Sequence, residues 1–468
     1  MKFIKKHKLI NIDWPNFGIC KRLPISNFKD YMKRISKIKI NMEKKKLTHL
    51  IVYGDREHFA NITYLTGYDP RFEESILIIK KEDKPLVLVG NEGKNYLNIS
   101  PLVKEGEIRY ELFQSFSLLS QDRKDSRSLK DIFIDERINK RSIVGCIGWK
   151  YFLKEENLDA AHSIEIPSYI VDIVRELVGY DNVINVSDIL MHPEYGLRTY
   201  CSSSEIAFFE YSNTLASEGI KRMIKNIKVG MTDYELAEYT KYNGVPLSFH
   251  TIIGTKKNFN LGFPSPCGFI INRKDPISMA LGYWGSNICR VGWVASSELD
   301  LPEHAKGYVK DFAGIYFEAM NEWYMNMRIG KSGGELAKLI LKKLPYKKFG
   351  IDLNPGHLIH LDEWVSSPIF LGSDFKIHSG MYFQVDVIPF SNKYFSTRME
   401  EGIIIADKNL QYKIKKEYPE CFNRCQERRN FVINTIGIDL PEEILPLSNM
   451  AAIVPVFFLE PNIILSLK

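Results

Sequence analysis

The sequence predicts two domains, an α/β domain followed by a domain that mixes helices with strands. The chain has 468 residues, more than a single hydrophobic core usually serves. Up to about residue 195, short apolar strands alternate with amphipathic helices, which is the pattern of an α/β domain. His192-Pro193-Glu194-Tyr195-Gly196 then combines two breakers of regular structure. We therefore expect one domain over residues 1–197 and a second over residues 198–468.

Three elements open the first domain. Between Ser26 and Lys44, apolar residues recur every three or four positions, which predicts an amphipathic helix. Residues 50–53 are a short apolar run closed by Gly54, typical of a buried strand. Residues 58–65 have a helical pattern that ends at Gly67.

A hairpin and a further strand follow. Residues 74–79 and 85–90 are strands joined by a charged turn over Lys80 to Lys84. Residues 142–148 form another apolar strand.

The second domain begins with helices. Ser202 to Glu205 offers N-cap residues for a long helix that we expect to run to Gly230. A second helix is predicted from Asp233 to about Tyr242. Residues 384–388 alternate polar and apolar side chains, which predicts a strand.

Composition and charge exclude several classes of protein. Apolar content of 45% with 12% aromatic residues is that of a globular protein. The net charge of +6 has no clustered basic stretch, so nucleic-acid binding is not expected. The basic N-terminus lacks the apolar segment of a signal peptide, and no later segment predicts a membrane span. The seven scattered cysteines indicate free thiols, so we expect a soluble, cytoplasmic protein.

Residues 354–402 contain most of the side chains that could carry chemistry. His357, His360 and Asp362 form one cluster, and Asp386 and Glu400 follow on later strands. Imidazoles and carboxylates from neighbouring strands could form a metal site, an acid/base pair or a plain polar network.

The same stretch carries a family resemblance. Gly356-His357, Ser379-Gly380-Met381 leading through Asp386 to Pro389, and Arg398-Met399-Glu400-Glu401-Gly402 resemble the second half of a pita-bread domain. This is the fold of creatinase, prolidase, Xaa-Pro aminopeptidases and methionine aminopeptidases. Ile62 to Tyr68, followed by Arg71 to Ser75, resembles the domain that precedes it. The resemblance implies an α/β N-terminal domain, an α+β pita-bread domain built on a curved antiparallel sheet, and a homodimer.

The resemblance also implies five metal-ligand positions, namely two Asp, one His and two Glu that together hold two divalent ions. In this sequence these positions are Ala280, Asn287, His357, Asp386 and Glu400. A methyl group cannot bind a metal, and a neutral amide is a weak ligand for a hard dication. Counting only two remaining carboxylates, we expect no metal and no cofactor. The alternative is a weakly bound Mn or other divalent metal ion.

The predicted site residues fall into two groups. Two family histidines that orient substrate or move protons correspond to Phe263 and Trp364 in this sequence, and with Asn287 and Arg290 these form the expected substrate-binding set. The expected catalytic set is His357, His360, Asp362, Asp386 and Glu400. Either His357 or His360 would act as general base, polarised by Asp362 or Asp386. The structural alternatives are a His360–Asp362 pair on one strand, a core role for His357 and an exposed Glu400-Glu401 pair.

The sequence therefore predicts a creatinase/Xaa-Pro aminopeptidase-like protein without the usual dinuclear metal site. It would hydrolyse a small amide or amidine without metal, or bind a small molecule or short peptide as a pseudoenzyme. The alternative is a metal-dependent Xaa-Pro aminopeptidase or dipeptidase. Neither a nucleic acid nor a membrane is an expected partner.

Overall fold

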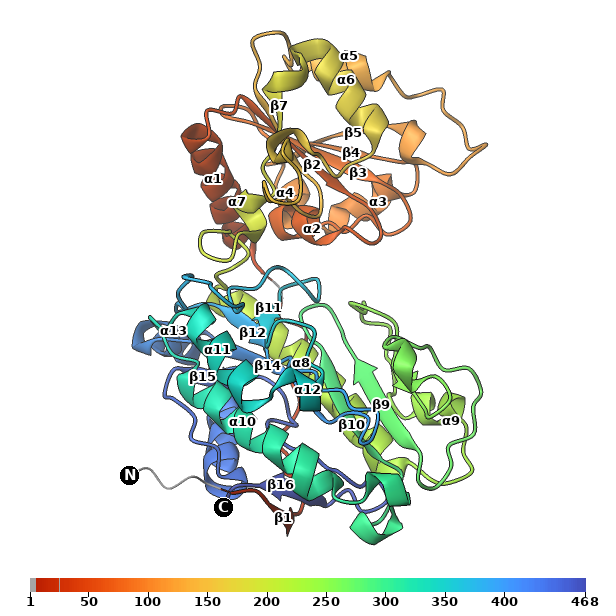
Figure 1. The fold of residues 1–468 in the computed structure, drawn as a ribbon. Coiled ribbons are helices and arrows are strands. Elements are labelled where there is room, and N and C mark those ends of the chain that lie inside the picture. The colour runs from red at the N-terminus through yellow and green to blue at the C-terminus, as the bar shows by residue number, and fades with distance from the viewer. Residues whose placement is uncertain (1–5, 25) are drawn as a thin grey trace. The chain divides into compact units, whose positions relative to one another are not determined.

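The computed structural model describes residues 6–24 and 26–468, which divide into two compact units (Figure 1). One unit covers residues 26–198, and the other combines residues 199–468 with the described residues before 25. The boundary after residue 198 lies one residue from the predicted one. The N-terminal segment differs from the prediction, because strand β1 (Lys8–Asn11) pairs antiparallel with β16 (Ile463–Ser466) and so belongs to the second unit.

The unit over residues 26–198 is built on a six-stranded sheet with the order β5-β4-β3-β2-β6-β7. Parallel and antiparallel pairs are mixed in this sheet. Helices α5 (Leu129–Asp135) and α6 (Ser168–Val178) pack their apolar residues on the face that carries Ile51, Ile76 and Leu88. The strands are β2 (His49–Gly54), β3 (Ser75–Lys80), β4 (Leu86–Val89), β5 (Arg109–Leu112), β6 (Val144–Ile147) and β7 (Val183–Asn185).

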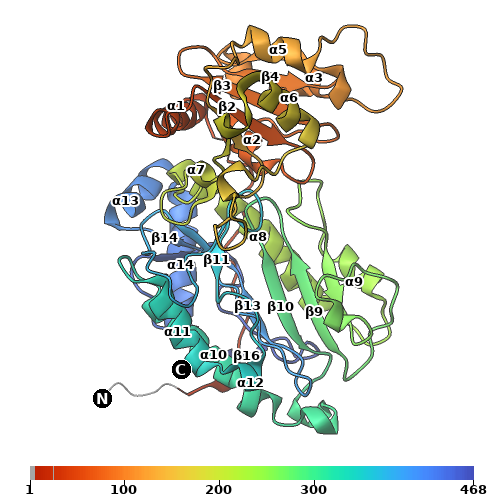
Figure 2. The same ribbon diagram turned by 45° about the horizontal axis from the view of Figure 1, so that its top comes forward.

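The second unit contains two four-stranded antiparallel sheets, ordered β13-β10-β9-β8 and β11-β12-β14-β15. Figure 2 shows β13, β10 and β9 side by side. The strands are β8 (Ile252–Gly254), β9 (Pro276–Leu281), β10 (Ile288–Trp293), β11 (His357–Leu358), β12 (Tyr382–Gln384), β13 (Arg398–Glu400), β14 (Gly402–Ile405) and β15 (Ile444–Pro446).

Several helices begin directly after a residue whose side chain caps them. Asn27 and Ser202 each form a capping box at the starts of the first and the longest helix. The helices are α1 (Phe28–Lys44), α2 (Ala60–Thr66), α3 (Gly93–Tyr96), α4 (Pro101–Lys104), α5 (Leu129–Asp135), α6 (Ser168–Val178), α7 (Asp188–Met191), α8 (Ser203–Asn226), α9 (Asp233–Glu238), α10 (Gly314–Asn326), α11 (Gly333–Lys343), α12 (Tyr346–Phe349), α13 (Lys408–Glu417) and α14 (Pro419–Phe431).

Three elements end earlier than the sequence predicts. Helix α8 stops at Asn226 because Ile227 is already extended. Helix α9 stops at Glu238, shortly before Lys241 adopts a positive φ of 50°, which an α-helix cannot accommodate. Strand β12 ends at Gln384, the last residue that pairs with β11, so Asp386 lies just beyond the strand.

Alternation along β9 separates the core of the second unit from an open face. Ile277, Met279 and Leu281 face helix α8, whose apolar residues form one cluster with them. Ser278 and Ala280 point to the other face, because successive strand residues project to opposite sides. Helix α8 therefore fixes this sheet from behind and leaves its opposite face free for a site.

The segment from Arg398 to Ile405 links the two sheets, since it forms β13 in one and β14 in the other. At the crossing, Glu401 is fully buried and its Oε2 lies 2.6 Å from Nη2 of Arg290. Glu401 also accepts hydrogen bonds from Tyr324 and from the backbone N–H of Ala452. This ion pair joins the two sheets in the core.

Across the described residues, no helix is both long and apolar enough to cross a membrane. The cytoplasmic location stays a prediction.

The buried ion pair between the sheets gives a stability test. Glu401→Gln leaves the Arg290 guanidinium buried without its counter-ion, so we expect it to lower the free energy of unfolding by about 3 kcal/mol. Glu335→Gln is the control, because Glu335 forms an exposed pair with Lys331 in the same unit and its loss costs about 0–1 kcal/mol. Urea unfolding measures both, and equal effects of the two variants would contradict the role given to the buried pair.

Candidate functional site

The open face of the β13-β10-β9-β8 sheet forms the floor of a pocket of about 890 Å³. Residues that alternate along the strands line it, in register across the sheet: Ala280 pairs with Cys289, which pairs with Glu400, and Ser278 pairs with Val291, which pairs with Arg398. The remaining wall mixes polar and apolar residues and includes five large aromatic side chains, Phe249, Phe259, Phe263, Trp364 and Phe390.

The turn between β9 and β10 is held by packing that only glycine permits. Gly285 has a φ of 77°, and a Cβ atom there would lie 2.1 Å from a ring carbon of Phe209. Its carbonyl accepts hydrogen bonds from the Tyr382 hydroxyl at 2.7 Å and from Nδ2 of Asn213 at 3.2 Å. The short hairpin is therefore fixed against α8 and β12, and this fixes Asn287 two residues later.

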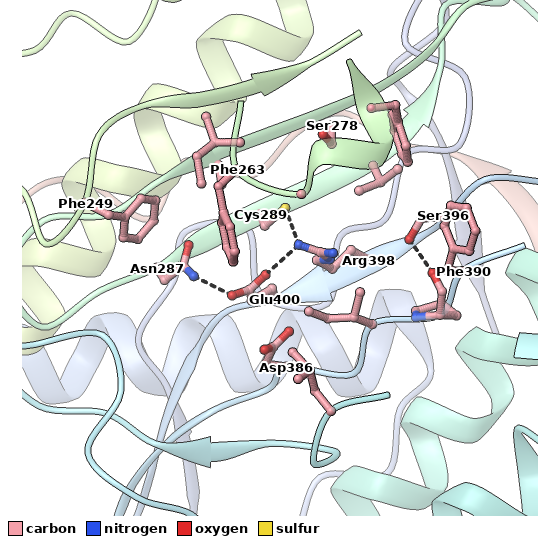
Figure 3. A pocket seen from close by; sticks show the side chains of 18 of the residues that line it. Phe249, Phe263, Ser278, Asn287, Cys289, Asp386, Phe390, Ser396, Arg398 and Glu400 are labelled. Carbon is pink, nitrogen blue, oxygen red and sulfur yellow. Dashed lines mark hydrogen bonds and ion pairs between the residues drawn. The ribbon is translucent and has the colours of Figure 1, made fainter. Parts of the chain in front are cut away.

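A polar row crosses the pocket floor (Figure 3). Asn287 donates from Nδ2 to Oε1 of Glu400, and Nη1 of Arg398 lies 3.4 Å from Oε2 of the same carboxylate. Arg398 also donates to Sγ of Cys289 at 3.3 Å. Figure 3 shows Asp386 reaching toward Glu400 from the opposite wall. Glu400 is thus held between an amide and a guanidinium.

His357 lies behind this row and has no exposed surface. Its Nδ1 donates to the carbonyl of Leu358, so Nε2 points toward two carboxylates. Nε2 lies 3.2 Å from Oε1 of Glu363 and 3.8 Å from Oδ2 of Asp386. The Trp364 ring stacks on the imidazole with centroids 4.0 Å apart. His357 is therefore not part of the pocket lining, but it contacts three lining residues, Glu363, Trp364 and Asp386.

The loop after β11 explains why Glu363 and Trp364 contact His357. The backbone N–H of Leu358 donates to the carbonyl of Ser366 at 2.8 Å, and that of Val365 donates to the carbonyl of Leu358 at 3.0 Å. The chain folds back between these residues and returns Glu363 and Trp364 to His357.

Burial and the nearby charges shift the pKa values of all four titratable groups around His357 and Glu400. Burial alone would lower the pKa of His357, but the carboxylates of Glu363 and Asp386 outweigh it and raise this pKa to about 9. Burial opposes the ionisation of Glu363 too, yet the charge of His357 keeps the Glu363 pKa below its ordinary value. Burial raises the pKa of Asp386. Burial and the charge of Asp386 together raise the pKa of Glu400 to about 8.

The structure brings most of the predicted site residues together. Asn287, Phe263, Trp364, Asp386 and Glu400 line the pocket, and His357 contacts two of its lining residues, Glu363 and Asp386.

Three predicted site residues lie elsewhere. Arg290 is fully buried in the core, where it pairs with Glu401 and donates to four backbone carbonyls. His360 is paired with Glu205 of α8 at 3.1 Å, and Asp362 is absent from the pocket wall. The alternative that placed His360 and Asp362 on one strand is wrong, because β11 ends at Leu358 and a loop follows it.

Glu363, Arg398 and His250 are among the polar pocket residues that the sequence interpretation missed. Glu363 makes the predicted count of two carboxylates wrong, since three converge here. Arg398 could have been found, because it precedes Glu400 by two residues and so shares its face of the strand. His250 is exposed and its Nε2 donates to the carbonyl of Phe263 at 3.1 Å.

The residues present do not fit a dinuclear metal centre. Ala280 contributes a methyl group at one expected ligand position, and Asn287 turns the N–H side of its amide to Glu400 and Glu363 at another. Within residues 6–24 and 26–468, no group of three or more His, Cys, Asp or Glu side chains has an arrangement that could hold a metal ion. Two closely spaced dications need more anionic oxygen than these positions supply.

Comparisons with known proteins identify the fold. No family model matches the sequence, and no curated protein matches it. Among solved structures, the prolidase from Pyrococcus horikoshii OT3 is 16% identical with a TM-score of 0.61 and covers 80% of this chain and 95% of its own. The Xaa-Pro dipeptidase from Bacillus anthracis is 14% identical with a TM-score of 0.61, and the match covers 81% of this chain and 96% of the dipeptidase. The X-Pro aminopeptidase from Thermotoga maritima MSB8 is 16% identical with a TM-score of 0.60, and the match covers 80% of this chain and 95% of the aminopeptidase.

These matches confirm the predicted fold, an N-terminal α/β domain with a mixed sheet and a C-terminal pita-bread-like domain. At this level of identity the similarity concerns the fold alone, so the chemistry of the pocket has to be argued from its own residues.

The pKa shifts predict how stability depends on pH. His357 titrates near 6.5 when unfolded and near 9 when folded, so its contribution is complete below pH 6.5 and is lost as the pH rises to 9. We expect the free energy of unfolding to fall by about 1–3 kcal/mol over this interval. Glu400, with a pKa raised from 4.5 to about 8, acts in the same direction at lower pH.

Urea unfolding at several pH values measures this fall. His357→Gln should make it shallower between pH 6.5 and 9, whereas His378→Gln, outside the pocket in the same unit, should change the slope little. If His357→Gln leaves the pH dependence of the free energy of unfolding unchanged, the pairing of His357 with Glu363 does not hold the imidazole in its protonated form.

Proposed function

We propose that this chain binds a small molecule or short peptide in the pocket of its C-terminal unit without a dinuclear metal centre. The observation that carries the proposal is the internal pairing of charges. Arg398 lies beside Glu400, and His357 lies beside Glu363, at 3.4 and 3.2 Å respectively. The guanidinium of Arg398, the imidazole of His357 and the proton that Glu400 retains at neutral pH thus balance the carboxylates that bound dications would otherwise have to balance.

The size and lining of the pocket support a small ligand. Its volume of about 890 Å³ and its lining of aromatic, aliphatic and polar side chains are typical of a site for a small molecule or short peptide. Asn287, Glu400 and Arg398 form a polar row on the floor, where they would orient the ligand.

A second candidate function is metal-free hydrolysis of a small amide or amidine. It is favoured by the exposed imidazole of His250 in the pocket wall and by Glu400, whose pKa of about 8 keeps it protonated at neutral pH. A neutral imidazole can take a proton from water, and a protonated carboxyl group can donate one to a leaving nitrogen. Arg398 would polarise the reacting carbonyl or amidine carbon by its charge. In this scheme His357 only positions Glu363.

Metal analysis tests the proposal. The purified protein should hold no stoichiometric Mn, Co or Zn, and added Mn should produce neither saturable binding by calorimetry nor Xaa-Pro dipeptide hydrolysis. The Ala280→Asp/Asn287→Asp double variant supplies two carboxylates at the expected ligand positions, so it should bind Mn more tightly than the wild type by at least about tenfold.

About two equivalents of metal per wild-type chain, together with metal-stimulated cleavage of Xaa-Pro peptides, would contradict the proposal and favour a metallopeptidase. Turnover of an amide or amidine in the presence of a chelator, lost in both His250→Ala and Glu400→Gln, would support hydrolysis over simple binding.

A further inference from the structure

The guanidinium of Arg398 has one edge without a hydrogen-bond acceptor. Its Nη1 donates to Sγ of Cys289 at 3.3 Å and lies 3.4 Å from Oε2 of Glu400 (Figure 3). Its Nε is buried and has no hydrogen-bond partner, and across residues 6–24 and 26–468 no group accepts a hydrogen bond from Nη2. The Nε–Nη2 edge is therefore left over, although Arg398 lines the pocket and its side chain is 21% exposed.

The covalent geometry of a guanidinium places these two donors side by side. The N–H bond of Nε and one N–H bond of Nη2 are parallel and lie on the same edge of a rigid plane, which matches the oxygen atoms of a carbonyl or carboxylate group. Arginine does not lose its proton in proteins, so this edge donates whatever the protonation of the neighbouring carboxyl groups. A buried donor without an acceptor is costly, and a ligand oxygen would remove that cost.

An apolar strip adjoins Arg398 on the pocket floor. Val291 of β10 pairs in register with Arg398 of β13, so the two side chains stand next to each other on the same face of the sheet. Val291 belongs to a buried apolar cluster with Ile252, Phe259, Ala280 and Cys289. Ala280 has the smallest side chain of this cluster and lies in β9, between β8 and β10, so it leaves the most space above the floor.

Resting on the proposed function, we propose that the pocket selects a ligand in which a carbonyl or carboxylate oxygen is attached to a bulky apolar group. The oxygen accepts hydrogen bonds from the Nε–Nη2 edge of Arg398. Because Val291 stands beside Arg398, the apolar group attached to this oxygen lies over the apolar strip and extends toward Ala280. An uncharged amide and a carboxylate share this chemistry.

Calorimetric titration of the full chain in the presence of a chelator tests both parts of the ligand. 3-Phenylpropanamide and 3-phenylpropanoate each carry an acceptor oxygen and a phenyl group. The one that binds more tightly should bind at least about tenfold better than phenethylamine, which has no acceptor oxygen, and than propanamide and propanoate, which have no bulky apolar group. If 3-phenylpropanoate is the tighter of the two the ligand is a carboxylate, and otherwise it is an uncharged amide.

A substitution of Arg398 tests the polar anchor. Arg398→Lys keeps the positive charge but lacks the two parallel N–H bonds, so it should weaken binding of the tighter probe at least about tenfold and leave phenethylamine unaffected. Arg328→Lys, at an exposed position in the same unit, is the control and should change neither.

Two substitutions test the apolar strip. Ala280→Leu fills the floor and should weaken the tighter probe at least about tenfold, whereas Ala161→Leu, at an exposed position in the other unit, should have no effect. Val291→Ala removes apolar surface beside Arg398 without adding bulk, and should weaken the same probe about threefold or more. It replaces Ala280→Leu if that variant does not fold.

Equal or tighter binding of phenethylamine would overturn the proposal, because the pocket would then select a donor rather than an acceptor. Unchanged binding of both oxygen-bearing probes in Arg398→Lys, or in both Ala280→Leu and Val291→Ala, would overturn it as well, and so would failure of both probes to bind. Any of these results in a protein that binds no metal leaves the proposed function standing, whereas stoichiometric metal binding would remove the proposed function itself.

Discussion

Charge balance within the pocket is the constraint on which the chemistry of this protein depends. Three carboxylates, Glu363, Asp386 and Glu400, converge in a largely buried space. Such a group is stable only if positive charge or protons compensate it. Here the compensation comes from the guanidinium of Arg398, the imidazole of His357 and the raised pKa values of Asp386 and Glu400. Under the proposed function, these groups take the place of two bound dications.

The fold supplies this balance through one short segment. Residues 398–405 pass from one sheet to the other, so adjacent side chains serve different purposes. Glu400 projects into the pocket, while Glu401 projects into the core and pairs with Arg290. The core pair fixes the crossing point of the two sheets, and this in turn fixes Arg398 and Glu400 against Asn287. The Arg290–Glu401 pair therefore stabilises the core, while the Arg398–Glu400 pair belongs to the pocket. The two pairs are linked because Glu400 and Glu401 are adjacent in the chain.

Local patterns predicted individual helices, the family resemblance predicted the fold, and together they predicted only part of the pocket. Capping residues and apolar periodicity predicted α1 and α8, and the motifs around His357, Asp386 and Glu400 carried the resemblance to the pita-bread domain. Glu363 could not be predicted as a partner of His357, because their contact depends on the chain folding back between Leu358 and Ser366. Arg290 was misplaced because the strand pattern does not reveal which face of β10 is covered by the core.

Crystals soaked in Mn and measured at the Mn absorption edge would test the internal charge balance most directly. The account predicts no anomalous peak within coordination distance of Asp386 or Glu400, and an Arg398–Glu400 pair that stays in place. Two peaks bridged by these carboxylates, with the Arg398 guanidinium displaced, would contradict it.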